Sequence, residues 1–127
     1  MRQFINNSHD VPRVKSPISQ AVVVGKHCYI SGQLSTDWAG HYLAGSVEEE
    51  AKRAFDNVFA IAQAAGFSKA ELVFMDIAFL DLNDVDLIND LFAQLFDANQ
   101  YPARTIYQAA ALPYGGKVKV TAIGLKD

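Results

Sequence analysis

The sequence has one cysteine and three histidines in 127 residues, which excludes several kinds of site. Cys28 has no second cysteine with which to form an internal disulfide or a Cys-x-x-Cys metal pair. It is expected to be a small buried hydrophobe inside a strand. His9, His27 and His41 do not share the spacing of zinc ligands. We therefore expect neither a metal site nor a cofactor.

Long hydrophobic runs and clustered positive charges are also absent. No apolar run approaches the roughly 18 residues of a membrane span, and the N-terminal MRQFINNSHD lacks the apolar centre of a signal peptide. The 11 Lys and Arg residues are scattered and are outnumbered by 14 Asp and Glu, which gives a net charge of −3. Phosphate binding needs clustered cations. We therefore expect a soluble cytoplasmic protein with neither a membrane nor a nucleic-acid partner.

What the sequence does contain is enough apolar material for a core, since 50% of its residues are hydrophobic. This length and composition predict one domain over residues 1–127. The patterns of apolar and turn residues predict a hairpin within 20–33, a loop at 34–45, a helix at 46–65, a strand at 71–82, a helix at 83–96 capped by Asn83, and strands at about 103–111 and 117–125.

The first predicted helix has the clearest signals. Ser46 and Glu49 form a capping box, in which each side chain accepts a hydrogen bond from the other residue's backbone N–H. Apolar residues then recur at steps of three and four, and Gly66 offers a left-handed stop. Trp38 and Tyr42, on the loop before the helix, either roof a cleft or pack locally.

The order of these elements predicts an α+β fold, with two helices on one face of a mixed sheet of four to six strands. The predicted strand at 71–82 is apolar on both faces, apart from Asp76. Two helices cover only one face of a sheet. We therefore expect another subunit to cover the second face, with Asp76 paired in its interior.

An arginine in a strand-like run, YPARTIYQ (101–108), points to a binding site. Arginine is almost never fully buried unless an anion meets it. Two partners for Arg104 stay open on this evidence. One is the carboxylate of a ligand, and the other is a carboxylate of the chain itself, such as Asp76.

Three stretches resemble one protein family: SPISQAVVVGKHCYISGQ (16–33), DLNDVDLINDLFAQLF (81–96) and YPARTIYQAAALP (101–113). The similarity is to the Rid family of reactive intermediate imine/enamine deaminases, also called YjgF or endoribonuclease L-PSP proteins. Its most specific marks are Ser31-Gly32-Gln33, Pro102-Ala103-Arg104 and Leu112-Pro113. The resemblance implies a chorismate-mutase-like fold and a homotrimer around a central β-barrel, with pockets between subunits. It also implies hydrolysis of 2-imino acids to 2-keto acids and ammonia.

The resemblance also implies roles for individual residues. Arg104 would grip the substrate carboxylate through its planar guanidinium, and a backbone carbonyl near Ile106 would help to hold the attacking water. Ser31 and Asn89 fall on positions that shape the pocket. Two plainer alternatives stay open, with Ser31 simply ending a strand and Asn89 bonding a neighbouring backbone group.

Three positions depart from the deaminating members of the family. Ile18 stands where a tyrosine is usual and Ile106 where a cysteine is usual. The gravest change is Lys119, which replaces a glutamate thought to hold the attacking water. A backbone carbonyl survives any change of side chain, but a protonated lysine does not orient water as a carboxylate would.

Strand alternation places Arg104 and Ile106 on one face of their strand and Lys117 and Lys119 on one face of the next. If Arg104 and Lys119 face the same cleft, the pocket is doubly cationic. The hypothesis that follows is a preference for a dicarboxylic 2-imino or 2-keto acid. The alternative is a Lys119 that is solvated or paired with Asp76.

Three functions are therefore compared. The leading one is a deaminase of 2-iminobutanoate or 2-iminopropanoate type, with a shifted, more anionic substrate as a variant. The second is a non-catalytic binding module for small keto acids, which kept Arg104 and lost the water-holding glutamate. The third is the endoribonuclease and translation inhibitor suggested by one family name. The negative charge and the absence of a histidine pair for acid–base cleavage argue against this last function.

Overall fold

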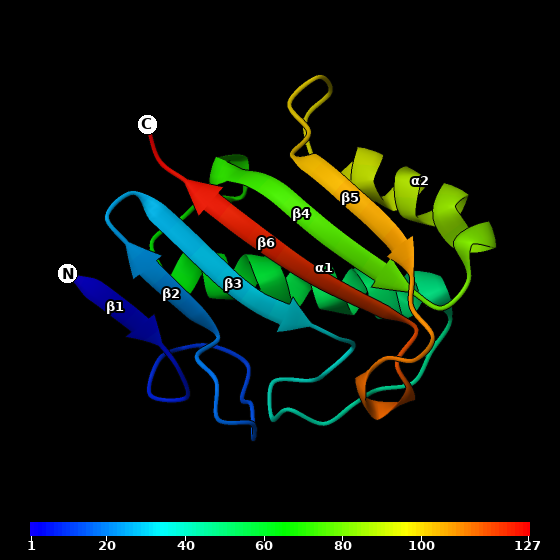
Figure 1. Cartoon of the computed structure of the whole chain (residues 1–127), viewed down its shortest axis with the longest axis horizontal. Coiled ribbons are helices and arrows are strands. Elements are labelled where there is room, and N and C mark those ends of the chain that lie inside the picture. Colours follow the sequence, from blue (N-terminus) through cyan, green and yellow to red (C-terminus); the bar gives the residue numbers. More distant parts are fainter.

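The structure, a computed structural model that describes residues 1–127, is a six-stranded mixed sheet with two helices on one face (Figure 1). Its elements are β1 (Arg2–Ile5), β2 (Ala21–Val24), β3 (His27–Gln33), α1 (Val47–Ala64), β4 (Leu72–Phe79), α2 (Val85–Leu95), β5 (Ala103–Gln108) and β6 (Val118–Leu125). The strand order is β1-β2-β3-β6-β4-β5. Only β4 and β5 pair in parallel, and the other neighbours are antiparallel. The predicted α+β class, with two helices on one face of a mixed sheet, is confirmed.

Local signals explain the hairpin and the first helix. The turn between β2 and β3 contains Gly25 at φ 58°, a conformation that glycine adopts without steric cost. At the start of α1 the Ser46 hydroxyl accepts from the Glu49 N–H (3.1 Å), and the Glu49 carboxylate accepts from the Ser46 N–H (2.9 Å). Gly66, at φ 87°, follows the end of the helix. The predicted capping box and glycine stop are confirmed.

Three details differ from the prediction. Strand β1 was not expected, and it pairs with β2 along its whole length. The strand predicted at 71–82 ends at Phe79, and a short 3-10 turn, Leu82–Asp84, follows it. Asn83 is not the cap of the second helix, because the Asp81 carboxylate already accepts from the Asn83 N–H (2.9 Å). Asp81 therefore starts the 3-10 turn, and α2 begins only at Val85.

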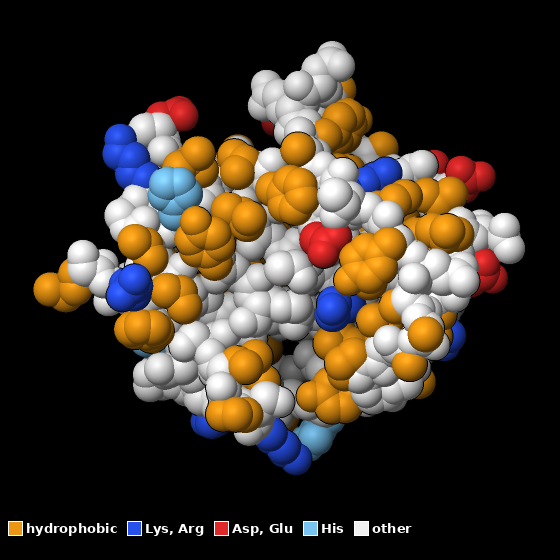
Figure 2. Space-filling model, viewed as in Figure 1, with side chains coloured by type: hydrophobic (Ala, Val, Ile, Leu, Met, Phe, Trp, Pro, Cys, Tyr) orange, Lys and Arg blue, Asp and Glu red, His pale blue; other side chains and the backbone are white.

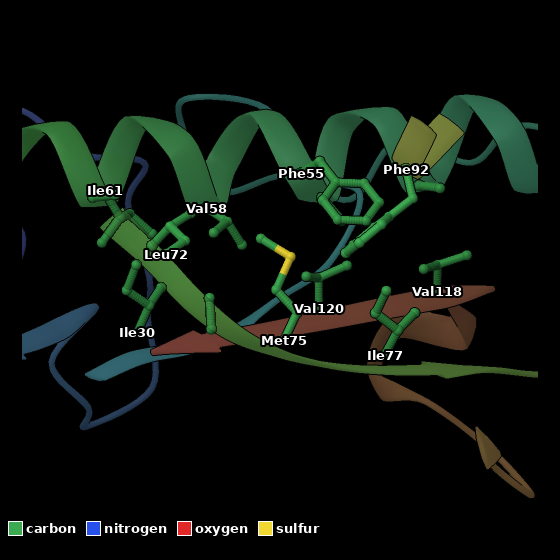
Figure 3. Packing of buried hydrophobic residues seen from close by; sticks show 14 of the residues in the cluster. Ile30, Phe55, Val58, Ile61, Leu72, Met75, Ile77, Phe92, Val118 and Val120 are labelled. Atoms are coloured by element: carbon green, nitrogen blue, oxygen red, sulfur yellow. The ribbon is translucent and has the colours of Figure 1, made fainter. Parts of the chain in front are cut away.

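The core lies between the sheet and α1, with α2 covering the β4–β5 end. Figure 3 shows Phe55, Val58 and Ile61 of α1 pointing toward Met75 of β4 and its neighbours on β6. All of these α1 and β4 side chains are fully buried. Burial of a large apolar side chain contributes about 1.5–3 kcal/mol, so this face of the sheet supplies most of the stability.

The opposite face of the sheet has no helix over it. Figure 2 shows this open face, where hydrophobic groups gather on both sides of a paler central band. Its exposed apolar side chains range from 39% exposed for Val24 to 52% for Phe4. Lys119, Asp76 and Thr105 also lie on this face. The oligomer expected to cover it stays a prediction. Neither α1 nor α2 has the length and apolar character needed to cross a bilayer.

Candidate functional site

Arg104 leaves β5 toward α2 and bonds a side chain of that helix. Its Nη2 donates to Asn89 Oδ1 (2.7 Å), and its guanidinium carbon lies 4.9 Å from the centre of the Phe92 ring. Burial lowers the pKa of the Arg104 guanidinium from its ordinary value. None of the ion pairs in the chain includes Arg104. The internal pairing with Asp76 is therefore not formed, and the positive charge has no anionic partner within the chain.

A hollow of about 430 Å³ lies beside this guanidinium. This Arg104 hollow is lined by Asn89, Phe92, Ala93, Tyr101, Pro102 and Arg104. The guanidinium carries five N–H donors, and one hydrogen bond to Asn89 leaves most of them free. A planar donor set against apolar walls suits a small carboxylate, which it binds through two oxygens.

The backbone of Ile106 points to the free edge of the sheet. The Ala109 N–H donates to Phe79 O of the neighbouring strand. Because backbone groups alternate in direction along a strand, the N–H and C=O of Ile106 point away from β4. Strand β5 is the last in the sheet, so these groups have no strand partner. The Ile106 side chain instead packs against the core.

Ile18 and Ser31 belong to a second region, at the end of β3. The Ser31 hydroxyl donates to Ser19 O (2.7 Å) and so ties the loop before β2 to β3. The buried Gln33 amide donates to Gln20 Oε1 (2.9 Å), which fixes the same loop. Ile18 stands exposed on this loop. Ser31 therefore does more than end a strand, since its hydroxyl positions the segment that carries Ile18.

Lys119 borders the same region through Gly32. A Cβ atom at Gly32 would lie 3.1 Å from Cδ and 3.3 Å from Cγ of Lys119, so the lysine chain runs directly against the glycine. The ammonium group makes no hydrogen bond or ion pair in the chain, with Asp76 or any other residue. A small hollow of about 40 Å³ here, the Gly32 hollow, is bordered by Ile18, Gly32 and Tyr114 among others.

The strand registers place Arg104 and Lys119 on opposite faces of the sheet. Arg104 pairs with the buried Met75 and so projects to the helix side. Lys119 lies between Val118 and Val120, which are buried under the helices, and so projects to the open face. Within one chain, Arg104 and Lys119 therefore do not face the same pocket. The predicted site residues divide into two groups, Arg104, Asn89 and Ile106 in one and Ile18, Ser31 and Lys119 in the other.

Asp76 lies on the open face, where its carboxylate accepts a hydrogen bond from the Thr105 hydroxyl of the neighbouring strand. Lys119 is its diagonal neighbour, because Asp76 pairs with Thr121 and Lys119 pairs with Ala78. The two charges nevertheless form no ion pair within the chain. Both remain available on the face that a second subunit is expected to cover.

A buried carboxylate near the Gly32 hollow was missed by the sequence reasoning. Glu50 of α1 is 0% exposed and accepts hydrogen bonds from the Tyr42 hydroxyl (2.8 Å), the Gly45 N–H (3.2 Å) and the Lys117 N–H (3.0 Å). Lys117 Nζ lies 3.3 Å from the same carboxylate. The sequence did contain a signal for this burial. Glu50 follows Val47 by three residues and so lies on the apolar side of the helix.

Opposing effects set the pKa of Glu50. Desolvation by burial acts to raise the pKa, but the hydrogen bonds from Lys117, Tyr42 and Gly45 together outweigh it and hold the pKa below its ordinary value. The carboxylate therefore stays ionised and joins α1 to the 34–45 loop and to the start of β6. Tyr42 packs locally through this network rather than roofing the Arg104 hollow.

The comparisons with known proteins agree with this fold. The family model described as endoribonuclease L-PSP matches residues 8–125. The 2-iminobutanoate/2-iminopropanoate deaminase of Bos taurus is 43% identical over 127 residues, which cover 99% of this chain and 91% of that protein. RidA from the Antarctic bacterium Psychrobacter sp. PAMC 21119 is 36% identical with a TM-score of 0.89, covering 98% of this chain and 99% of that chain. Escherichia coli TdcF with bound serine is 33% identical with a TM-score of 0.87, covering 98% and 100% respectively.

Proposed function

The chain belongs to the endoribonuclease L-PSP family, also called the Rid family, and we propose that it hydrolyses reactive 2-imino acids to 2-keto acids and ammonia. The observation that carries this proposal is the Arg104 guanidinium, which has free donors, no anionic partner and an adjoining hollow. Relatives named as imine deaminases support the reaction class.

The chemistry follows from Arg104 and Asn89, which line this hollow, and from the backbone of Ile106, two residues farther along β5. Arg104 holds the substrate carboxylate, and Asn89 fixes the direction of the guanidinium. The free-edge carbonyl of Ile106 accepts a hydrogen bond from the attacking water. Water oxygen adds to the carbon of the protonated imine while the C=N π pair moves to nitrogen, and the added water loses a proton to solvent. Nitrogen then takes up a proton and leaves as ammonia with the C–N pair, and loss of the hydroxyl proton forms the keto group.

This mechanism assigns no dedicated base, because Lys119 replaces the glutamate of the active relatives. Orientation of water and imine supplies the rate gain. Holding the water and the imino acid side by side converts their encounter in solution into a step within one complex. The protonated imine is already electrophilic, so the water needs little activation. Turnover without the carboxylate is therefore consistent with the residues present.

We also propose that the working site lies between two subunits of a homotrimer. The two groups of site residues lie on opposite faces of one sheet, so a single chain presents two separate halves. The open face exposes apolar side chains and unpaired charges, which a second copy would cover. In such a trimer the Arg104 hollow of one subunit adjoins the Gly32 hollow of the next.

The proposed preference for a more anionic substrate also depends on this contact between subunits. If Lys119 of one subunit approaches Arg104 of another, the joint pocket carries two positive charges. A dicarboxylic 2-imino acid then matches the pocket better than a monocarboxylic one. A thermal-shift comparison of 2-ketoglutarate with 2-ketobutanoate measures this preference, and a larger stabilisation by 2-ketobutanoate would contradict it.

A second candidate is a keto-acid binding module without catalysis, which the lysine at position 119 favours. The experiment that separates the two functions measures ammonia release from enzymatically generated 2-iminobutanoate. Wild type, Arg104→Ala and Lys119→Glu are compared, and Lys26→Ala, at an exposed turn, serves as a matched loss of positive charge. Faster release by wild type and Lys26→Ala, but not by Arg104→Ala, supports the deaminase. Binding of 2-ketobutanoate with background release supports the module.

A further inference from the structure

Tyr114 holds a backbone conformation that tyrosine rarely adopts. It lies in the 3-10 turn Pro113–Gly115 with φ 63° and ψ 9°, in the left-handed region. The only other non-glycine residue with positive φ is Asn99, and asparagine adopts this region readily. Two glycines follow Tyr114 directly, so residues suited to the region stand beside it. A strained position that keeps an aromatic side chain indicates that the side chain has a use.

The Tyr114 ring is supported by Tyr42, which belongs to the buried hydrogen-bond network of Glu50. It stacks on Tyr42 with ring centres 6.2 Å apart and an angle of 20° between planes. The hydroxyl of Tyr42 in turn donates to Glu50. On the other side of the turn, the Lys117 N–H donates to the same carboxylate. The ring, through Tyr42, and the segment after the turn, through Lys117, are thus both linked to Glu50 of α1, which holds the ring in one place.

The Tyr114 side chain borders the Gly32 hollow together with Ile18. It is 57% exposed, and its hydroxyl bonds no other group of the chain, in contrast to the hydroxyl of Tyr42. Ile18 offers no hydrogen bond to this hollow. The aliphatic part of Lys119 runs against Gly32, which borders the same hollow. A free phenol borders this hollow, and the side chain that carries a free ammonium group contacts its edge at Gly32.

We propose that Tyr114 is a substrate-contacting residue that sets specificity, by donating a hydrogen bond to the side-chain end of the bound imino acid. The inference rests on the proposed function, in which Arg104 of the adjoining subunit holds the other end of the ligand. Phenol and ammonium are both donors. The substrate class that fits them is a 2-imino acid whose side chain ends in an acceptor, such as a carboxylate.

The test compares Tyr114→Phe, which keeps the ring, with Tyr114→Asn, which suits the left-handed backbone. Each is assayed with 2-iminoglutarate and 2-iminobutanoate generated by an amino-acid oxidase. Loss of one hydrogen bond to a charged group predicts that kcat/KM for 2-iminoglutarate falls about 10-fold in Tyr114→Phe, mostly through KM. The value for 2-iminobutanoate changes less than about 2-fold, because that side chain accepts no such bond.

Stability measurements separate this role from a structural one. Tyr114→Asn relieves the backbone strain while it removes the stack on Tyr42, so its unfolding temperature stays within a few degrees of wild type. Its kcat/KM for 2-iminoglutarate falls at least as far as that of Tyr114→Phe. The control is Lys26→Ala, at the exposed turn between β2 and β3 and away from both hollows, which leaves both rates unchanged.

The possible failures are distinct. An active wild-type protein whose Tyr114→Phe variant treats both substrates equally would overturn the role of Tyr114 and leave the deaminase standing. A parallel loss for both substrates together with a lowered unfolding temperature would assign Tyr114 to structure alone. A wild-type protein that releases ammonia at the background rate would overturn the deaminase, and the role of Tyr114 in it.

Discussion

The Arg104 hollow rests on regular secondary structure, whereas the Gly32 hollow rests on loops held by buried polar groups. In the first, a strand supplies Arg104 and a helix supplies Asn89, joined by one hydrogen bond of 2.7 Å. In the second, Glu50 and the buried amides of Gln20 and Gln33 tie three irregular segments together. We therefore expect loss of Arg104 to leave the stability of the fold nearly unchanged, whereas loss of Glu50 destabilises the loops around the second hollow.

The largest expected effect is the loss of activity in Arg104→Ala. Removal of a bidentate charge-assisted contact predicts a fall in kcat/KM of about 100- to 1,000-fold. The free energy of unfolding changes by less than about 1 kcal/mol, because the side chain makes one hydrogen bond and no ion pair in the chain. Steady-state kinetics and urea unfolding measure the two. If Arg104→Ala lost stability as well as activity, the Arg104 hollow would not differ from the Gly32 hollow in this respect.

The next effect is on stability, in Glu50→Ala. This change leaves the hydroxyl of Tyr42 and the N–H groups of Gly45 and Lys117 without their acceptor. At roughly 1 kcal/mol for each abandoned donor, the free energy of unfolding falls by about 3 kcal/mol. Glu48→Ala, on the exposed side of the same helix, is the control and changes the free energy of unfolding by less than about 0.5 kcal/mol. Equal losses in the free energy of unfolding for Glu50→Ala and Glu48→Ala would show that the buried network does not hold the loops.

A smaller effect is expected in the pH dependence of the stability that Glu50 contributes. The pKa of Glu50 is lower in the folded protein than its ordinary value near 4.5. Its contribution is therefore fully present above that ordinary value and is lost as the pH falls through the lowered, folded value. Unfolding of wild type and Glu50→Gln across acidic pH measures this. The stability gap between them narrows as the pH falls, and a gap that widened would contradict the depressed pKa.

The smallest expected effect belongs to Lys119→Glu. Restoring a carboxylate at this position predicts a rise of about 3- to 10-fold in turnover of 2-iminobutanoate, since the carboxylate orients water. The same change weakens binding of 2-ketoglutarate, because a positive charge becomes negative. Calorimetry and the ammonia assay report the two effects. A variant with unaltered turnover would show that position 119 does not reach the reacting water.

The sequence predicted those features that short-range patterns determine. The capping box at Ser46 and the turn at Gly25 depend on neighbours within a few residues, and both formed as expected. Strand β1 escaped prediction because only Ile5 of its four residues is buried, so it shows no alternation. Such a short edge strand is recognised only through its partner, β2.

For the candidate site, the sequence singled out Arg104 as a candidate but did not show how the candidate residues are arranged in space. Arg104 was conspicuous because a charge in a strand needs a partner. Whether it shared a face with Lys119 depended on the register of two strands that do not pair directly, since β4 lies between them. Tyr114 was read only as part of a turn, because its stacking on Tyr42 joins residues that are distant in sequence.

The most direct test of the account is complementation between two defective chains. Arg104→Ala disables one hollow, and Ile18→Glu places a repelling charge at the exposed mouth of the other. Each variant alone is expected to lose most activity. If the site is shared between subunits of a trimer, co-refolding equal amounts restores about a quarter of the wild-type sites. If each site is instead built from one chain, every chain in the mixture carries a defect and no intact site forms. Activity that stays at the level of the separate variants would therefore contradict a shared site.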